Sequence, residues 1–435
     1  MSAILDLSSK IIDTGHYEGP NSVNRTSGEL SELAKNVGFI EAFSNVVTIQ
    51  TDDGLVLFDT SLDAFAPKVI QSLRGWSNAP VHTMAYTHGH IDHVGGASAF
   101  VDEARDKGHR RPRVVAHEHV PPRFDRYRLT NGYNAVINDR QFRSGAGRKT
   151  KISGGMSAGR FGPQTWIDPD TTFDDRMSLN IGGTRFDLRH DKGETDDHLW
   201  AWIPEHKAIV AGDFVIWVFP NAGNPQKVQR YPAEWAKALR QMIALEPELL
   251  LPAHGLPVHG QKRIATMLGD MALALEFLVE NALRLMNQGA KLDDILHSVK
   301  LPQGTLDKPY MRPVYDEPEF VLRNIWRLYG GWYDGNPSRL KPAKDAHLAA
   351  EIANLAGGAG RLAQRASDLA GQGDMRLACH LVEMAADADP ANKDVHAARR
   401  DIYRRRREGE LSLMAKGIFG AAAEESDGVV EGKGS

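Results

Sequence analysis

The fold prediction starts from one stretch of sequence, Thr87-His88-Gly89-His90-Ile91-Asp92-His93-Val94-Gly95-Gly96. This stretch places four side chains that can bind a metal within six positions. It ends a run of buried-strand character that begins at Val81. The first two histidines, two residues apart on an extended segment, therefore point the same way. The aspartate and the third histidine fall on the turn into a helix opened by the glycine pair, where they can face a second metal ion. Imidazole and carboxylate ligands in this pattern suit zinc, iron or manganese.

The composition limits both the ligands and the partners of this chain. Its 435 residues include one cysteine, Cys379, so no disulfide can form within the chain and any metal must be held by His, Asp and Glu. The 52 basic and 56 acidic side chains give a net charge of −4, which argues against a nucleic-acid binder. The N-terminus does not have the pattern of a signal peptide, and no apolar run is long enough to span a membrane. We therefore expect a cytoplasmic protein without a membrane anchor.

The hydrophobic pattern of the first part predicts an α/β fold. Val46–Ile49 and Leu55–Phe58 are strand-like, and Asp52-Asp53-Gly54 between them is typical of a hairpin turn. Further predicted helices cover 68–74 and 96–107, and further predicted strands cover 81–87, 113–116, 184–188, 199–203, 208–211 and 249–251. Strands that alternate with helices and hairpins indicate an α/β sandwich.

Two regions depart from this pattern. Residues 120–165 are rich in glycine and poor in periodic apolar residues, so we expect a long irregular insertion there. After residue 260 the spacing is helical, and residues 363–390 resemble one tetratricopeptide-like helix pair, which must pack on a neighbour or on a second subunit. Residues 411–435 are predicted to be a disordered tail.

The histidine loop resembles that of the metallo-β-lactamase superfamily, an αββα sandwich with its metal site at one edge of the sheets. The resemblance implies two Zn²⁺ or other divalent ions per subunit and further ligands downstream. Asp213, in Ala208-Ile-Val-Ala-Gly-Asp213, matches the family's bridging carboxylate, and His254, in Leu251-Pro-Ala-His-Gly255, matches its final ligand. Asp59 resembles the buried acid that braces the histidine loop. The resemblance implies that Asp92 and Asp213 are catalytic. The metal ligands implied by these motifs are His88, His90, Asp92, His93, Asp213 and His254.

One ligand position has two candidates in His190-Asp191-Lys192-Gly193-Glu194. His190 matches the superfamily's usual third histidine, whereas Glu194 matches a glutamate that replaces that histidine in the alkyl sulfatase branch. We keep both as expected ligands. The remaining nearby histidines are interpreted as surface or structural residues: His117, His119, His198, His206 and His259.

The helical part resembles the dimerisation domain of alkyl sulfatases. The resemblance rests on the aromatic segment 309–337, with its Gly331-Trp-Tyr-Asp-Gly-Asn-Pro337 turn, and on the later helix pair. It implies a homodimer with a catalytic domain over 1–260 and an all-α dimerisation domain over 261–410. That branch also carries a sterol-carrier-like third domain, which we expect to be absent here because the sequence stops soon after the helix pair.

The anion-binding part of the site departs from the alkyl sulfatase pattern. That branch places an arginine shortly after the bridging acid, and no arginine occupies the matching place here. Candidate substrate-binding residues are Asn134, Arg140, Asn221, Asn224, Lys227 and Arg230. The apolar run Phe214–Phe219 either lines a channel for an alkyl chain or forms a buried strand.

These observations favour a hydrolase in which a dinuclear zinc site activates water to cleave alkyl sulfates, small amphiphilic esters. The alternative enzyme is a hydrolase of another ester-like substrate, such as a lactone, thioester or phosphoester, and the missing arginine favours it modestly. A nuclease of the same fold has only the Arg404–Arg407 run in its support, and such runs are usually solvated helix faces.

Overall fold

The computed structural model describes residues 2–142, 161–163 and 165–432. Contacts divide the chain into two compact units: unit 1 comprises Met1–Ala135 and Gly154–Gly331, and unit 2 comprises Val136–Ser153 and Trp332–Ser435. Unit 1 thus extends past residue 260, where the sequence predicts a domain boundary. The reason is that apolar residues of the helices between 261 and 330 belong to the same hydrophobic core as the strands.

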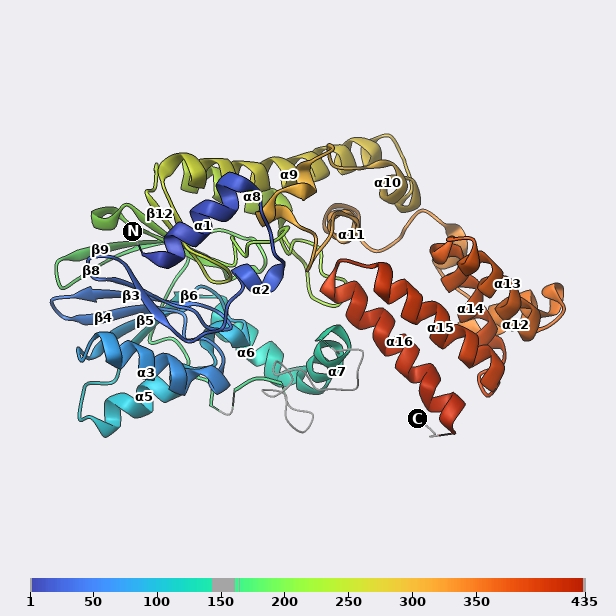
Figure 1. Ribbon diagram of the computed structural model, residues 1–435, viewed down its shortest axis with the longest axis horizontal. Coiled ribbons are helices and arrows are strands. Elements are labelled where there is room, and N and C mark those ends of the chain that lie inside the picture. Colours follow the sequence, from blue (N-terminus) through green and yellow to red (C-terminus); the bar gives the residue numbers. More distant parts are fainter. Residues whose placement is uncertain (1, 143–160, 164, 433–435) are drawn as a thin grey trace. The chain divides into compact units, whose positions relative to one another are not determined.

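Two sheets form the centre of unit 1 (Figure 1). In the described part of the chain the first sheet has seven strands in sequence order: β1 (Leu30–Ala34), β2 (Val37–Ile40), β3 (Val46–Thr51), β4 (Gly54–Phe58), β5 (Val81–Ala85), β6 (Arg113–His117) and β7 (Thr171–Phe173). The second has six described strands, in the order β13 (Val258–His259), β12 (Leu249–Pro252), β11 (Ala208–Gly212), β10 (Leu199–Ile203), β9 (Thr184–His190) and β8 (Arg176–Ile181). Pairing is antiparallel from β1 to β4, parallel from β4 to β7, and antiparallel in the second sheet except for the β11–β12 pair.

Helices cover the outer faces of both sheets, which gives the predicted αββα sandwich (Figure 1). The helices on the side of the first sheet are α3 (Ala66–Trp76) and α5 (Ala97–Asp106), with the short α4 (Ile91–Val94) before α5. Those on the side of the second sheet are α1 (Ala3–Thr14), α8 (Pro232–Ile243) and α9 (Gln261–Asn287). The other helices of unit 1 are α2 (Pro20–Val23), α6 (Val120–Leu129), α10 (Leu292–Ser298) and α11 (Pro318–Gly330).

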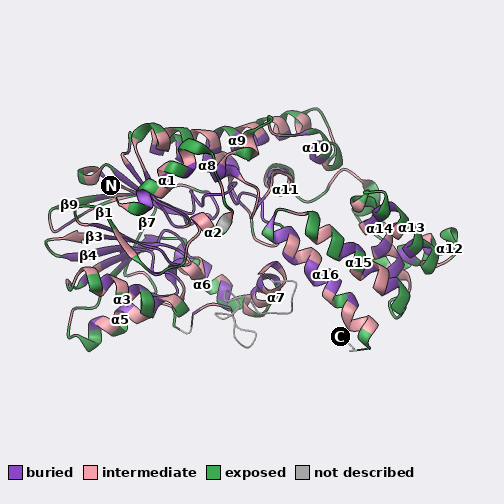
Figure 2. Ribbon diagram, in the orientation of Figure 1, coloured by how far each residue is buried: buried purple, intermediate pink, exposed green. Residues whose placement is uncertain are grey.

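The predicted hairpin and the strand–helix alternation are confirmed. Strands β3 and β4 pair antiparallel, with Thr51 opposite Gly54 across the turn. Every residue of β4 and β11 is buried, because each strand has a sheet neighbour on both sides and is covered on both faces (Figure 2). Such strands read as continuous apolar runs in the sequence.

The region predicted as an irregular insertion is partly helical. Helix α6 occupies its start, and α7 (Asn131–Phe142) follows immediately. The prediction missed α6 because Pro121-Pro122 indicates a break in the pattern, whereas both prolines lie in the first turn of the helix, where proline is tolerated. Residues 143–160 of this region lie outside the described residues.

Unit 2 contains the helices α12 (Asp345–Ala356), α13 (Ala359–Gly371), α14 (Met375–Ala388), α15 (Lys393–Gly409) and α16 (Leu413–Glu431). The predicted helix pair is α13 and α14, and it buries its apolar face against α12 and α15. The prediction of a disordered tail over 411–435 is wrong for the described residues up to 432. Met414 and Ala421 on one face of α16 are buried, and Ser412 caps the helix by accepting from the Ala415 N–H.

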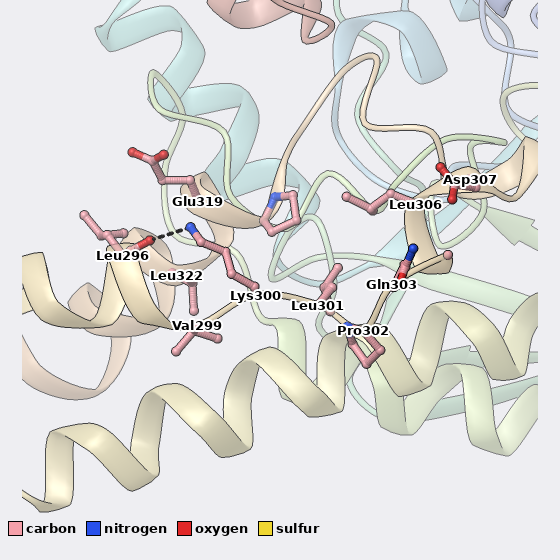
Figure 3. Close-up of a pocket in the computed structure, with 12 residues that line it drawn as sticks. Leu296, Val299, Lys300, Leu301, Pro302, Gln303, Leu306, Asp307, Glu319 and Leu322 are labelled. Carbon is pink, nitrogen blue, oxygen red and sulfur yellow. Dashed lines mark hydrogen bonds between the residues drawn. The ribbon is translucent and has the colours of Figure 1, made fainter. Parts of the chain in front are cut away.

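A cavity of about 300 Å³ lies beside α10 and α11 (Figure 3). Its lining is mostly apolar and includes Val299, Leu301 and Leu322, while Lys300 Nζ donates to the Leu296 carbonyl at 3.1 Å. No candidate metal ligand lines this cavity. Among the helices that the structure describes, none is long and apolar enough to cross a membrane.

Candidate metal centre

The histidine loop follows strand β5. Two of its glycines, Gly89 and Gly96, lie so close to neighbouring residues that a side chain would not fit there. A Cβ on Gly96 would lie 2.2 Å from the Thr60 carbonyl oxygen, so only glycine allows the start of α5 to pack against the end of β4. A Cβ on Gly89 would lie 2.9 Å from both Arg123 Cδ and Asp197 Oδ2. The loop is therefore held against neighbouring elements by contacts that its glycines permit.

The loop brings its ligand atoms together with residues from distant parts of the chain. Within the described residues, three groups of side chains could hold a metal ion: His88, His93 and Asp213; Asp92, His93 and His254; and His90, Glu194 and Asp213. The ligand atoms of each group lie within 4.8 Å of one another. Seven of the eight sequence-predicted ligands thus converge at one edge of the two sheets.

Asp213 connects the two sides of this cluster. Its Oδ1 lies 3.4 Å from His93 Nε2 and 3.5 Å from His254 Nε2, and the same His254 nitrogen is 3.3 Å from Asp92 Oδ2. Its Oδ2 lies 3.9 Å from His88 Nε2 on the other side. The two carboxylate oxygens therefore face two separate sets of nitrogen and oxygen atoms, which is the arrangement of a bridging ligand.

On the His88 side the ligand atoms are equally close. His88 Nε2 and His90 Nδ1 are 2.8 Å apart, and His90 Nδ1 is 3.7 Å from Glu194 Oε1. His190, the alternative candidate for this position, is in none of the three groups. Its Nδ1 lies 2.8 Å from the His198 carbonyl oxygen, and its ring stacks on His117 with centroids 3.7 Å apart. The structure therefore brings Glu194, and not His190, to the candidate ligands.

The donor set fits a divalent cation. His93 Nε2 and Asp213 Oδ1 are buried and make no hydrogen bond to any described residue. A buried polar atom without a partner is costly, and a metal ion would satisfy both atoms at once. Imidazole and carboxylate donors without thiolate suit zinc and other first-row divalent metals.

The electrostatics of the cluster favour neutral imidazoles on the His88 side. Burial, and next the neighbouring His93, lowers the pKa of His88 well below its ordinary value, and burial together with Arg230 does the same for His90. Both rings therefore keep a lone pair for a metal at neutral pH. Burial raises the pKa of Glu194 well above its usual range, and the adjacent Asp213 carboxylate adds to the rise.

Asp59, at the end of β4, holds the loop in place. Its Oδ1 accepts from the Thr87 N–H at 2.7 Å, and its Oδ2 accepts from the Thr87 hydroxyl at 2.8 Å. The same Oδ2 lies 2.7 Å from His93 Nδ1. A carboxylate that accepts a hydrogen bond from Nδ1 fixes the imidazole proton on that nitrogen. The lone pair of Nε2 then stays free, which is the arrangement that metal-binding histidines usually have.

Several positioning residues were not identified from the sequence. His198 Nε2 accepts from the Asp213 N–H at 3.0 Å, so this histidine orients the bridging acid from the second sheet. Asn45 Nδ2 donates to the carbonyls of Pro252 and Gly255, which flank His254. The sequence carries no signal for these roles, because each depends on a contact between segments that are far apart in the chain.

A buried ion pair supports the histidine loop from α6. Arg123 Nε donates to Asp197 Oδ2 at 2.6 Å, and the same oxygen accepts from the Gly89 N–H at 3.0 Å. Arg123 is 4% exposed and Asp197 is fully buried. The backbone between His88 and His90 is therefore tied to a buried charge pair.

The predicted substrate-binding residues have different surroundings. Asn221 Nδ2 donates to Glu194 Oε1 at 2.6 Å, and the buried Arg230 guanidinium donates to both the carbonyl and the carboxylate of Glu194. Asn134 is in unit 1, where its Nδ2 donates to the Thr130 carbonyl, whereas Arg140 is in unit 2. Asn224 and Lys227 lie in the segment after Asp213.

The apolar run Phe214–Phe219 is buried but is not a strand. Strand β11 ends at Gly212, and Trp217 has a positive φ of 58°, which a regular strand does not allow. Trp217 Nε1 donates to the Leu256 carbonyl at 2.6 Å. The run therefore packs as an ordered loop beside the cluster.

Fold and ligand set together define the class of protein. Residues 40–254 match the metallo-β-lactamase superfamily profile, and residues 291–428 match the alkyl sulfatase dimerisation profile. The chain is thus a metallo-β-lactamase superfamily protein that also carries an alkyl sulfatase dimerisation domain.

Curated relatives are alkylsulfatases. A linear primary-alkylsulfatase of Pseudomonas sp. is 26% identical over 88% of this chain and 74% of its own length. An alkyl/aryl-sulfatase of Saccharomyces cerevisiae is 26% identical over 82% of this chain and 56% of its own. The solved structure of a stereoselective inverting sec-alkylsulfatase from Pseudomonas sp. is similar with a TM-score of 0.80 at 25% identity, covering 92% of this chain and 66% of that one.

Proposed function

We propose that this protein is a metal-dependent hydrolase of alkyl sulfate esters. The observation that carries the proposal is the convergence of seven His, Asp and Glu ligands around Asp213, in a chain whose relatives are alkylsulfatases. We assign His88, His90, Glu194 and Asp213 to one ion, and Asp92, His93, His254 and Asp213 to the other. We take both ions to be zinc.

Two divalent ions held in this way would lower the pKa of a water molecule and polarise the ester. The chain's own residues supply the positioning. We assign catalytic roles to Asp92 and Asp213, whose carboxylates would orient the attacking water at the metal centre. Asp59 keeps the proton of His93 on Nδ1, and Asn221 with Arg230 fixes the carboxylate of Glu194.

The experiment is a substrate panel on purified protein, with dodecyl sulfate, a lactone, a thioester and a phosphodiester, each with and without chelator. We expect sulfate release from dodecyl sulfate that stops with the chelator and in His90→Ala. His206→Ala is the matched control, because His206 lies in the β10–β11 turn outside the three ligand groups. Turnover of another ester class without sulfate release would support the alternative substrate, and turnover unaffected by chelator would refute the metal site.

We also propose that the protein is a homodimer, because residues 291–428 match a dimerisation domain. Light scattering on the purified protein tests this. A mass twice that of the 435-residue chain supports it, and a monomer at micromolar concentration contradicts it.

A further inference from the structure

Two phenylalanine rings of unit 1 lie outside its hydrophobic core. Phe43 is in the loop between β2 and β3, and Phe65 ends the 3₁₀ turn Asp63–Phe65 that follows β4. Both side chains are partly exposed, and within the described residues neither belongs to a core cluster or to the apolar residues packed against one. The two rings contact each other instead, with centroids 6.3 Å apart and planes inclined by 40°. They form an aromatic pair that is partly open to a ligand.

The aromatic pair contacts the candidate metal centre through Phe43. The Phe43 ring meets the imidazole of His254 edge to face, with centroids 5.9 Å apart and an interplanar angle of 84°. This geometry is that of a favourable aromatic contact. His254 Nε2 is in turn 3.3 Å from Asp92 Oδ2, within one of the three ligand groups. The aromatic pair therefore begins at a candidate metal ligand.

The loop that carries Phe43 is fixed to both sides of this ligand group. The Asn45 N–H donates to the carbonyl of Ala253, the residue before the final ligand, at 2.6 Å. Ser44 Oγ lies 3.2 Å from His93 Nδ1, and both Ser44 and Asn45 are buried. The Phe43 ring is therefore held in place by its neighbours in the sequence, and not only by its own contacts.

The segment that leads to Phe65 is fixed to the histidine loop. The N–H and the hydroxyl of Thr60 donate to the His93 carbonyl at 2.7 and 3.0 Å, and the Gly96 N–H donates to the Ser61 carbonyl at 3.0 Å. Ser61 has a positive φ of 62°, which a residue other than glycine keeps only where its surroundings hold it. Both rings are thus placed relative to the metal cluster before any ligand binds.

We propose that Phe43 and Phe65 bind the alkyl chain of the substrate, at the carbon atoms that follow the ester oxygen. A ligand whose polar end is held at the metal cluster has its first carbons beside His254, where the aromatic pair begins. The run Phe214–Phe219 offers no comparable surface, because its side chains are buried. The identity of the ester rests on the proposed function, whereas the binding of an alkyl chain beside a polar head group does not.

The two rings should contribute affinity in proportion to chain length. Burying one methylene contributes about 0.8 kcal/mol, which is roughly a fourfold change in the dissociation constant. Rings that are already held in place bind a chain at little further cost in side-chain entropy. The expected signature is therefore a dissociation constant that falls with each added methylene, and a dependence that weakens when either ring is removed.

The test is calorimetric binding of methane-, butane- and octane-1-sulfonate, which have no ester bond to cleave, to the zinc-loaded protein. Octane-1-sulfonate should bind the wild type roughly 60-fold more tightly than methanesulfonate, the equivalent of three buried methylenes. Phe43→Ala and Phe65→Ala should each lower that ratio roughly 4- to 16-fold, and Phe43→Leu should keep most of it. Phe419→Ala is the matched control, because Phe419 is also partly exposed and forms an aromatic pair in unit 2, with Tyr403 at 5.8 Å.

The outcomes separate chain binding from support of the metal centre. Zinc content and the dissociation constant of methanesulfonate should be unchanged in both alanine variants. The proposal is overturned if the wild type shows no dependence on chain length, if either variant keeps the wild-type ratio, or if Phe419→Ala lowers it equally. Loss of zinc, or equal weakening of all three sulfonates, would assign the ring to support of His254 and also overturns the proposal. If dodecyl sulfate is not hydrolysed but octane-1-sulfonate binding still depends on the two rings, the chain site stands and the proposed reaction fails.

Discussion

Replacing Asp59 with asparagine changes the proton on His93 with little change of shape. The Oδ1 of asparagine can accept the hydrogen bond from the Thr87 N–H that Asp59 Oδ1 accepts at 2.7 Å. The NH₂ group of asparagine then takes the place of Asp59 Oδ2, which lies 2.7 Å from His93 Nδ1. A donor at that place forces the imidazole proton from Nδ1 to Nε2. His93 Nε2 would then donate toward Asp213, 3.4 Å away, instead of offering a lone pair to a metal.

We expect Asp59→Asn to weaken binding of one metal ion by roughly 10- to 100-fold, about 1.4 to 2.7 kcal/mol, the usual effect of losing such a carboxylate partner. Zinc titration against a chromophoric chelator at pH 7.5 measures this. Asp53→Asn is the control, since the exposed Asp53 also accepts one backbone N–H, that of Gly182, away from the ligands. A folded Asp59→Asn protein that binds two zinc ions with unchanged affinity would refute the role given to Asp59.

Three further predictions concern the scaffold. Arg123→Met leaves the buried Asp197 charge unpaired and should lower the free energy of unfolding by roughly 3–5 kcal/mol in urea titrations; a loss below about 1 kcal/mol would contradict the buried pair. Burial raises the pKa of Asp316 to about 6 from 3.8, so the folded state holds this proton more tightly than the unfolded state. Protonated Asp316 therefore contributes to the free energy of unfolding below pH 4. This contribution, roughly 3 kcal/mol, is lost as the pH rises to 6. Asp316→Asn should flatten that slope, and an unchanged slope would show that other groups cause it. Asn392 caps α15 by accepting from two backbone N–H groups, so Asn392→Ala should cost about 1 kcal/mol in thermal unfolding, and no change would mean that the cap is dispensable.

Local patterns were sufficient to predict much of the catalytic fold. The β3–β4 hairpin followed from its turn residues, and β10 has the predicted bounds, Leu199–Ile203, because a strand buried on both faces is a short apolar run. Helix α16 was missed because glycine and acidic residues obscure its apolar face, which packs against other helices of unit 2. Strand β8 was missed although Met177, Leu179 and Ile181 alternate with polar residues, which is the pattern of a half-buried strand.

The candidate site was predictable where its residues form a motif. The histidine loop and the turns that hold Asp213 and His254 are each a short local motif that can be recognised in the sequence. The structure brings these three motifs together. The choice between His190 and Glu194 was not decidable, because His190 ends β9, Glu194 lies four residues later, and only the turn after β9 determines which one faces Asp213. Arg123 was not predicted because its partner, Asp197, lies in a different segment of the chain.

One measurement tests the metal centre most directly: sulfate released from dodecyl sulfate by protein stripped of metal with a chelator and then given zinc in steps. We predict no release from the stripped protein, and recovery that reaches its maximum at two zinc ions per chain. Sulfate release by the metal-free protein, or zinc binding that restores no release, would contradict the assignment of the seven-residue cluster around Asp213 to a catalytic metal centre.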